Sequence, residues 1–456
     1  MADYCEGREN NPEHYPGAEA IHTRGFFIGV HQVPLSDETI DRLAEVLLSF
    51  PFKARHVTLV TGASGMVGRH VRDMMMLIVE SKPSSSAGVA VKSSDDDRLL
   101  VDASESSRWV FVSSADGDLR DVDQVRDLFR QHLPTRVLHL AAHLASTMEM
   151  TKRPVEYWLD NIAINNNVLQ VANEFRVRVG SVKVVSVLST AMLPAVVSPS
   201  SSAMLTTSMT NRMNEEIHLV PQTSMTTSAT TFRSEKTHLV PKTSMTTSAT
   251  SITCTSKEIH SGPPPSLVSE SYAYAKRALD LLTRWYRVQY QADFVTVLPG
   301  NIFGAYGDFD PRTAPLVNSL IAKMETARIK GMAAVEMIGT GRPRRQVLWA
   351  GDLARVLVWA MDHLDQDLPL MVPGVDLSIQ EIAEEICDEV GFEGKVSFES
   401  SPDRDGPVRT SADGSQFSDL LPSFEPLSFR EGVRRTLQWY RTTIAPPSSL
   451  SPPSKL

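Results

Sequence analysis

The stretch "TGASGMVG", residues 61–68, restricts the possible folds of this chain more than any other feature. It follows the apolar run "VTLV" and leads into "MVGRHVRDMMMLIVE", so it joins a strand to a helix. Gly62, Gly65 and Gly68 have the spacing G-x-x-G-x-x-G. Glycines at this spacing permit a tight turn and let backbone N–H groups at a helix N-terminus approach a pyrophosphate. The pattern predicts a dinucleotide-binding turn, with a purely structural glycine turn as the alternative.

Further short apolar runs follow at helix-length separations, at 108–114, 136–142, 182–189 and 294–299. Continuous apolar strands between helices are typical of a parallel sheet covered on both faces. The sequence therefore predicts a doubly wound α/β (Rossmann) domain over residues 56–303.

After residue 304 the pattern loosens. "VEMIG" resembles a strand, "RQVLWAGDLARVLVWAMDHL" reads as a strand and then a helix, and two Ser-x-x-Glu capping boxes begin at Ser378 and Ser428. We expect a smaller C-terminal substrate-binding domain over 304–443, with 345–365 as the part that could pack back on the first domain.

Three segments fall outside these two domains. Residues 1–55 are expected to form an N-terminal extension, and the Pro/Ser-rich tail 444–456 is expected to be disordered. The Ser/Thr-rich stretch 195–257 contains "HLVPQTSMTTSAT" and its near copy "HLVPKTSMTTSAT". Two copies are too few for a stacking repeat, so we expect a duplicated, mostly unstructured loop insert.

Composition argues for small-molecule chemistry. The formal charge of -9 comes without a basic block, which indicates neither a nucleic-acid partner nor a membrane surface. Three scattered cysteines predict no metal site and no disulfide framework. With no apolar stretch of signal-peptide or membrane-spanning length, a cytoplasmic protein is expected.

The strand "RWVFVSS" ends in Ser113 and Ser114, and Asp118 follows in "GDL" as a further expected cofactor-binding residue. An acidic residue at the strand tip would bind both ribose hydroxyls of NAD and repel a 2′-phosphate. No acidic residue stands at the tip itself, so NADP (NADPH) is the expected cofactor.

Ser189 ends a later strand, and "SYAYAKR" places Tyr272 and Lys276 four residues apart, on one face of a helix. A phenol with a pKa near 10 is a poor acid at neutral pH unless a neighbouring ammonium stabilises its anion. We expect Lys276 to lower the pKa of Tyr272, Tyr272 to pass its proton to a substrate, and Ser189 to bind the substrate oxygen.

Taken in this order, the glycine turn, the serine and the Tyr-x-x-x-Lys pair resemble the extended short-chain dehydrogenase/reductases, and in particular the GDP-L-fucose synthases. The matching stretches are "WVFVSSADGDLRD", "VLHLAA", "YWLDNIAINNNVL", "KVVSVLST", "SYAYAKR", "IGTGRPRRQ" and "DLARVLVWAM".

This resemblance implies an NADPH-dependent oxidoreductase that reduces C4 of a GDP-linked 4-keto-6-deoxy sugar after epimerising C3 and C5. It implies Ser189, Tyr272 and Lys276 as catalytic residues, with Tyr272 and Lys276 also contacting the cofactor. It adds Asn301 as a cofactor contact, Arg345 as a substrate contact, and a homodimer.

The resemblance fails at the two proton carriers of the epimerase step. The family has a cysteine where this chain has Ala191 and a histidine where it has Pro315. His143 is a candidate substitute base, although a loop histidine with an ordinary hydrogen bond is the more common case. Ala145 and Ser146 also replace paired glycines of the family.

Three hypotheses therefore stand at this point. The first is a GDP-L-fucose synthase-like reductase with the epimerase step in doubt. The second is a reductase or epimerase acting on another nucleotide sugar. The third is a non-catalytic dinucleotide-binding protein whose insert contacts partners or is phosphorylated.

Overall fold

The computed structural model describes residues 56–81, 99–101, 107–144, 147–194, 253–260, 270–310, 313–399 and 409–444. Its largest sheet has seven strands within these residues. In spatial order they are β11 (Leu370–Val372), β7 (Phe294–Pro299), β5 (Lys183–Val187), β4 (Arg136–His139), β1 (His56–Thr61), β3 (Ser107–Val112) and β2 (Leu99–Val101).

All neighbouring strands of this sheet are parallel except β2, which runs antiparallel to β3 at one edge. The predicted doubly wound α/β fold is confirmed. One detail differs: the structure has a short strand, β2, that the sequence did not predict and that precedes β3 along the chain.

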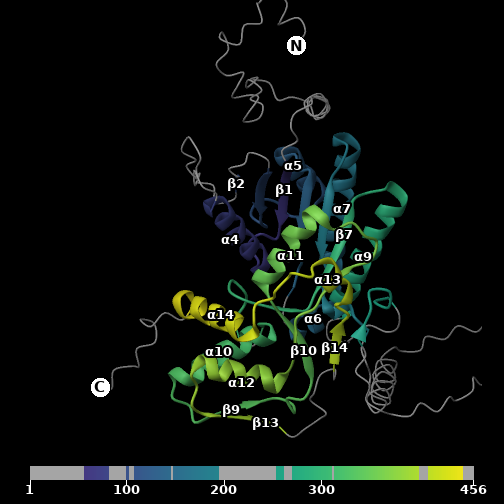
Figure 1. Ribbon diagram of the computed structural model, residues 1–456. Coiled ribbons are helices and arrows are strands. Elements are labelled where there is room, and N and C mark those ends of the chain that lie inside the picture. The colour runs from purple at the N-terminus through teal and green to yellow at the C-terminus, as the bar shows by residue number, and fades with distance from the viewer. Residues whose placement is uncertain are drawn as a thin grey trace, which may run out of the picture.

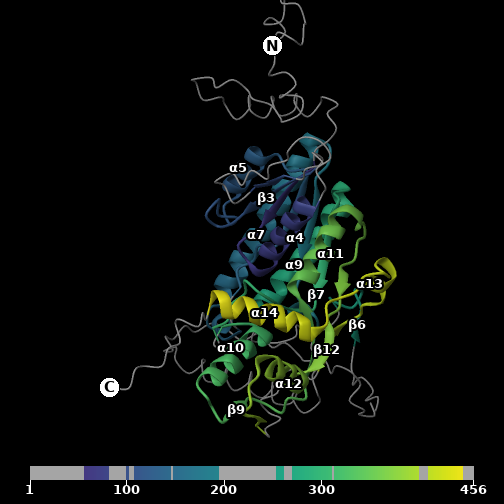
Figure 2. The same ribbon diagram turned by 60° about the vertical axis from the view of Figure 1, so that its left-hand side comes forward.

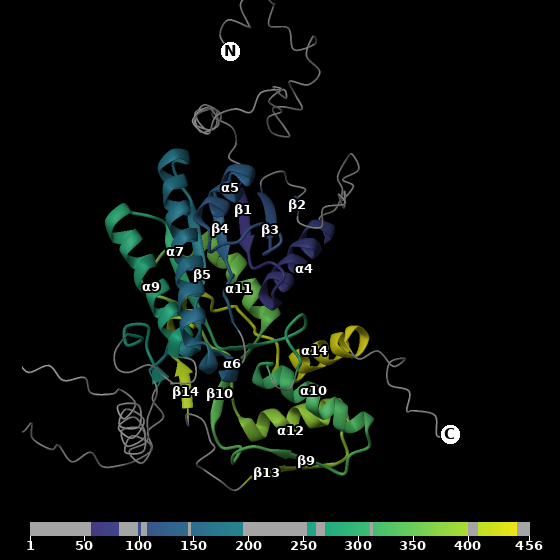
Figure 3. The same ribbon diagram turned by 180° about the vertical axis from the view of Figure 1, so that it is seen from behind.

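Helices cover both faces of the sheet (Figures 1 and 3). One face packs on α5 (Val122–His132), α7 (Pro154–Val179) and α9 (Glu270–Tyr290), and the other packs on α4 (Met66–Ser81) and α11 (Ala350–His363). Alternate residues of each strand serve the two cores: Leu59 faces the first helix group and Val60 faces the second. Burial on both faces explains why these strands are continuously apolar.

A second group of elements lies at the end of this sheet where the strands finish (Figures 1 and 2). Its five-stranded sheet comprises β12 (Val375–Ser378), β10 (Arg344–Trp349), β14 (Arg409–Ala412), β6 (Thr253–Cys254) and β8 (Asn301–Phe303). A third core forms around α10 (Leu316–Ile329), α12 (Ile379–Val390), α14 (Phe429–Thr443) and the pair β9 (Ala334–Met337) and β13 (Lys395–Phe398). Short elements are α6 (Thr147–Lys152), η2 (Thr190–Met192) and α13 (Ser415–Leu420).

The two predicted capping boxes both begin helices. At α12 the box is complete: the Ser378 hydroxyl accepts the Glu381 N–H, and the Glu381 carboxylate accepts the Ser378 N–H. At α14 the Ser428 hydroxyl accepts the Glu431 N–H, whereas the Glu431 carboxylate pairs with Arg434 and Arg435. At α14, therefore, only the hydrogen bond to the serine hydroxyl of the predicted capping box forms.

Several predictions concern residues that the structure does not describe: the extension 1–55, most of the insert (195–252) and the tail from residue 445. The division into 56–303 and 304–443 stays a prediction. Among the described helices, none combines the length and apolar character needed to cross a membrane.

Candidate active site

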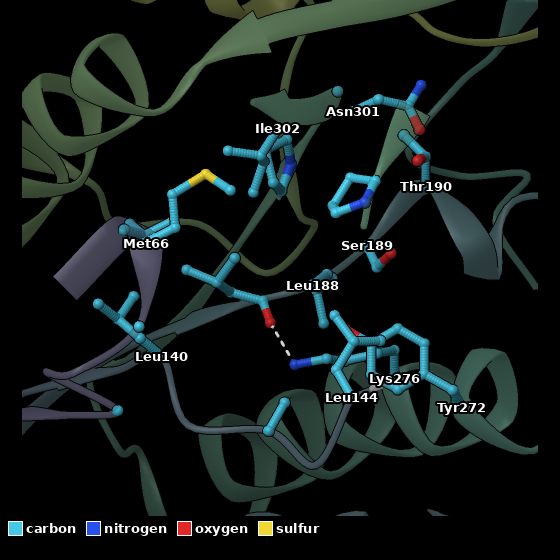
Figure 4. Close-up of a pocket in the computed structure, with 18 of the residues that line it drawn as sticks. Met66, Leu140, Leu144, Leu188, Ser189, Thr190, Tyr272, Lys276, Asn301 and Ile302 are labelled. Atoms are coloured by element: carbon cyan, nitrogen blue, oxygen red, sulfur yellow. Dashed lines mark hydrogen bonds between the residues drawn. The ribbon is translucent and has the colours of Figure 1, made fainter. Parts of the chain in front are cut away.

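A cavity of about 440 Å³ lies at the carboxyl ends of the parallel strands, between the large sheet and the second group of elements. This is where open α/β sheets place their ligands, and the volume suits a cofactor or substrate. Figure 4 shows side chains from α4, α9, β8 and the ends of β4 and β5 around it. Of the predicted site residues, the cavity is lined by Gly62, Gly65, Gly68, Ser189, Tyr272, Lys276, Asn301 and Arg345.

The glycine turn forms one wall. Gly62 has φ +70°, and a Cβ atom there would lie 2.7 Å from the backbone N of Ala141. A Cβ on Gly68 would lie 2.6 Å from the Cα of Ala63. These two glycines are needed for the turn and for helix packing, whereas Gly65 is exposed at the start of α4 and leaves the backbone there open. The wall therefore fits the diphosphate of a dinucleotide cofactor.

Tyr272 and Lys276 lie on the buried face of α9, 7% and 3% exposed. The Lys276 Nζ atom is 5.7 Å from the centre of the Tyr272 ring and donates a hydrogen bond of 2.7 Å to the Val187 carbonyl (Figure 4). Ser189 caps η2, where its hydroxyl accepts the Ala191 N–H, and it also hydrogen-bonds the Tyr272 phenol. The three residues expected to be catalytic thus come together at one cavity.

The expected electrostatics of the pair are wrong in one respect. Burial raises the pKa of Tyr272 to about 12, and the opposing influence is its hydrogen bond with Ser189 rather than the Lys276 charge. Burial also lowers the pKa of Lys276 to about 8. The physical reason is that desolvation disfavours both charged forms, while the ammonium is directed at the Val187 carbonyl. Near neutral pH the site therefore holds a protonated phenol beside an ammonium.

Asn301 of β8 and Arg345 of β10 also line the cavity. The Asn301 amide donates to the Gln346 carbonyl at 3.0 Å, which fixes it against β10, the strand that carries Arg345. The β8–β10 pairing holds both residues on one small sheet.

Asp118 does not line the cavity. Its carboxylate accepts hydrogen bonds from the Arg120 guanidinium at 2.7 to 3.1 Å, and these bonds hold the pKa of Asp118 below its usual range. A cofactor role for Asp118 stays a prediction.

Asp116 was missed by sequence reasoning. Its carboxylate accepts the Ser113 N–H at 2.7 Å and the Ser113 hydroxyl at 3.0 Å, at the end of β3. Val112, the preceding residue, accepts the N–H of Ala63 in the glycine turn. An acidic group therefore does reach the strand tip, so the sequence argument for NADP from a tip without an acidic residue is wrong in this detail. The weak sequence signal for Asp116 was the Ser-x-x-Asp spacing, which permits the side chain to turn back.

The His143 side chain does not line the cavity. Its neighbours Ala142 and Leu144 line the cavity, but its Nδ1 atom lies 2.7 Å from the Asp160 carboxylate and its ring packs on Tyr157, with centroids 4.4 Å apart. This geometry favours the structural alternative over a substitute base.

Neither position that carries a proton in the epimerase step can do so here. Pro315 lines the cavity at the start of α10, and Ala191 packs against the cluster of Met150, Tyr157 and Tyr272. Among the described residues that line the cavity there is no Asp, Glu, His or Cys.

Comparison with known proteins agrees with this geometry. The model of the family described as "NAD dependent epimerase/dehydratase family" matches residues 58–215 and 242–371. A GDP-L-fucose synthase from Dictyostelium discoideum is 28% identical over 391 residues, covering 85% of this chain and 96% of that protein.

Solved structures extend the likeness to the fold. A GDP-L-fucose synthetase from Naegleria fowleri superposes with a TM-score of 0.61 at 27% identity, covering 86% of this chain and 94% of that chain. The same protein bound to NADP gives a TM-score of 0.61 at 26% identity, over 85% and 93% of the two chains. A GDP-6-OMe-4-keto-L-xylo-heptose reductase from C. jejuni, at 17% identity and a TM-score of 0.60 over 85% and 98%, shares the fold.

Proposed function

Because this chain belongs to the NAD dependent epimerase/dehydratase family, we propose that it reduces the C4 ketone of a GDP-linked 4-keto-6-deoxy sugar with NADPH. The observation that carries the proposal is the convergence of Ser189, Tyr272 and Lys276 on the cavity that the glycine turn also lines. Relatives that match this chain over nearly their whole length are named GDP-L-fucose synthase or synthetase. One structure of such a relative holds NADP.

The residues present fit the cofactor. Gly62, Gly65 and Gly68 would hold its diphosphate, and Asn301 and Lys276 would face its reactive end. When bound, the cofactor supplies the hydride that adds to the ketone carbon.

The chain supplies the proton and the orientation. The Ser189 hydroxyl donates to the ketone oxygen and holds it beside Tyr272. Tyr272, which burial keeps protonated, gives its phenolic proton to that oxygen as the hydride arrives at carbon. The Lys276 charge does not set the pKa of the resting phenol, so its proposed role begins with the phenolate: its Nζ atom, 5.7 Å from the centre of the Tyr272 ring, supplies a positive charge near the anion. Arg345, which also lines the cavity, would contact the diphosphate of the nucleotide sugar.

Substitution of the phenol tests this role. Tyr272→Phe keeps the ring but removes the proton donor, so kcat should fall by about 10²- to 10⁴-fold. NADPH affinity, measured by nicotinamide fluorescence, should change little. An active Tyr272→Phe enzyme would contradict the mechanism, and a wild-type protein that binds NADPH but turns over no GDP-, UDP- or dTDP-linked keto sugar would favour the non-catalytic hypothesis.

We propose further that reduction proceeds without epimerisation at C3 and C5. Inversion there requires a group that removes a proton from carbon beside the ketone, and the described cavity lining offers no carboxylate, imidazole or thiol. The substrate would therefore keep its C3 and C5 configuration in the product.

Heavy water separates the two outcomes. The protein is incubated with GDP-4-keto-6-deoxymannose in D₂O without NADPH, and the recovered sugar is analysed by NMR. We expect no enzyme-dependent deuterium at C3 or C5, and the same result for His143→Ala. Incorporation as fast as hydride transfer would show that epimerisation survives, and its loss in His143→Ala would identify the base.

A homodimer and a cytosolic location complete the proposal. The location rests on the cysteine usage of the sequence. The dimer is supported by apolar side chains exposed near the N-terminal ends of α7 and α9: Val155, Trp158, Leu159 and Tyr274.

A further inference from the structure

Two consecutive basic residues of α9 bind the backbone on either side of Ser189. Lys276 donates a hydrogen bond of 2.7 Å to the carbonyl of Val187, two residues before the serine (Figure 4). Arg277, the next residue on the helix, donates from its Nε atom to the carbonyl of Met192 at 2.8 Å, three residues after the serine. The chain is therefore fastened to α9 both before and after Ser189.

The Arg277 bond reaches Ser189 through the short helix η2. The Met192 N–H donates to the Ser189 carbonyl at 3.1 Å, and the Ala191 N–H donates to the Ser189 hydroxyl at 3.2 Å. A single turn of 3₁₀ helix has few hydrogen bonds of its own, so contacts from outside the turn must hold it in place. A donor that holds the Met192 carbonyl therefore also holds the turn that Ser189 caps.

The cap determines where the Ser189 hydroxyl can donate. Its oxygen accepts the Ala191 N–H, so its hydrogen remains for a different acceptor. In the resting site the hydroxyl bonds the Tyr272 phenol: burial raises the pKa of Tyr272, and this bond opposes the effect, as a donor to the phenolate would. In the proposed reaction the same hydrogen goes to the ketone oxygen. A displaced η2 would direct it away from both acceptors.

Arg277 is only 6% exposed, which is uncommon for a guanidinium. Burying a charged group is costly unless favourable contacts offset the loss of water. Besides its bond to Met192, the guanidinium lies over the Tyr274 ring, with 5.7 Å between Cζ and the ring centre. Met192 and Leu193 are fully buried in the core that α9 covers. Water therefore cannot replace the arginine at the Met192 carbonyl.

We propose that Arg277 is a positioning residue for the reduction: its bond to the Met192 carbonyl fixes η2 and, through η2, the direction of the Ser189 hydroxyl. The inference rests on the proposed function, in which Ser189 donates to the ketone oxygen. Arg277 does not line the cavity, so it acts through the backbone of η2 and not by contact with the substrate.

Two variants test whether the hydrogen bond is what matters. Arg277→Gln places an amide N–H donor as many bonds from Cα as the arginine Nε atom, and Arg277→Met has a side chain of the same length without a donor. In Arg277→Met we expect kcat to fall about 10- to 100-fold with little change in KM, because the hydroxyl is misdirected when the ketone oxygen gains charge. In Arg277→Gln, kcat should stay within about threefold of the wild type.

A double-mutant cycle with Ser189→Ala tests whether the effect passes through the serine. In that background Arg277→Met should change kcat by less than about twofold, because no hydroxyl remains to be misdirected. Arg284→Met is the matched control. Arg284 is a partly buried arginine of the same helix, but its partner is the buried Asp280 instead of η2. Its loss should cost stability and leave kcat within about twofold of the wild type.

Amide hydrogen exchange gives a readout that does not need turnover. Peptides that contain the N–H groups of residues 191–193 should exchange about tenfold faster in Arg277→Met than in the wild type, and at the wild-type rate in Arg277→Gln and Arg284→Met. If the wild type reduces no keto sugar, the proposed function fails, while these exchange rates still decide whether Arg277 holds η2.

Four results would overturn the positioning role. They are an unchanged kcat in Arg277→Met, an Arg277→Gln enzyme as slow as Arg277→Met, additive effects of Arg277→Met and Ser189→Ala, and unchanged exchange at residues 191–193 in Arg277→Met.

Discussion

Burial dominates the chemistry of single residues in this protein. It moves the pKa of Tyr272 up to about 12, of Lys276 down to about 8 and of His139 down to about 4. Each shift favours the neutral form, as expected for groups removed from water. The spacing of Tyr272 and Lys276 could be read from sequence, but the sign of the phenol shift depends on how deeply the helix is buried, which spacing does not encode.

His139 should make the fold sensitive to acid. Burial lowers the pKa of His139 from its ordinary value of 6.5 to about 4, so the unfolded chain binds the proton more tightly. Its contribution is therefore complete above pH 6.5 and is lost as pH falls toward 4, a change of roughly 3 kcal/mol in the free energy of unfolding. Between pH 7 and pH 4.5, urea unfolding should show a larger loss in the free energy of unfolding for the wild type than for His139→Gln. Equal losses in the two proteins would show that protonation of His139 does not destabilise the fold.

At the scale of elements, hydrophobic patterning predicted the main strands and helices because parallel strands buried on both faces have a strong compositional signature. It missed β2, whose three residues are too few for a periodic signal. It also missed the Asp116 carboxylate at the tip of β3, because the turn that brings it back is set by hydrogen bonds to Ser113. Residues marked by a sequence pattern, such as the glycine turn and the Tyr-x-x-x-Lys pair, could thus be expected at one cavity. A carboxylate placed by side-chain hydrogen bonds within a turn could not.

The N-caps of α12 and α14 should differ in how much they stabilise the fold. Ser378 belongs to a complete capping box and Ser428 to half of one. Ser378→Ala should lower the free energy of unfolding by about 1 kcal/mol, and by more than Ser428→Ala does. Guanidinium unfolding of the two variants side by side checks the order, and Ser378→Thr, which keeps the hydroxyl, should recover most of the loss.

At the scale of the whole molecule, apolar side chains of α7 and α9 are exposed on the surface, where their function is not explained by the active site. Val155, Trp158 and Tyr274 border a shallow groove between the starts of these helices. Contiguous apolar patches on soluble proteins usually mark association sites, and twofold pairing of one patch with itself is the commonest solution.

Sedimentation velocity should therefore give twice the chain mass for the wild type. Trp158→Glu places a charge in the groove and should produce monomers. Trp285→Glu, at a 58% exposed position near the other end of α9, is the control and should leave the dimer intact. A monomeric wild type, or two variants that behave alike, would exclude this surface.

The order of the strands has a consequence for synthesis. β11, at residues 370–372, forms one edge of the large sheet, and β14, at residues 409–412, lies between β10 and β6. A nascent chain on the ribosome can build the glycine turn early, but the small sheet that carries Arg345 is complete only after residues 409–412 have been synthesised. Until then, folding intermediates should expose apolar strand edges. We therefore expect this protein to be bound by chaperones while it is being synthesised.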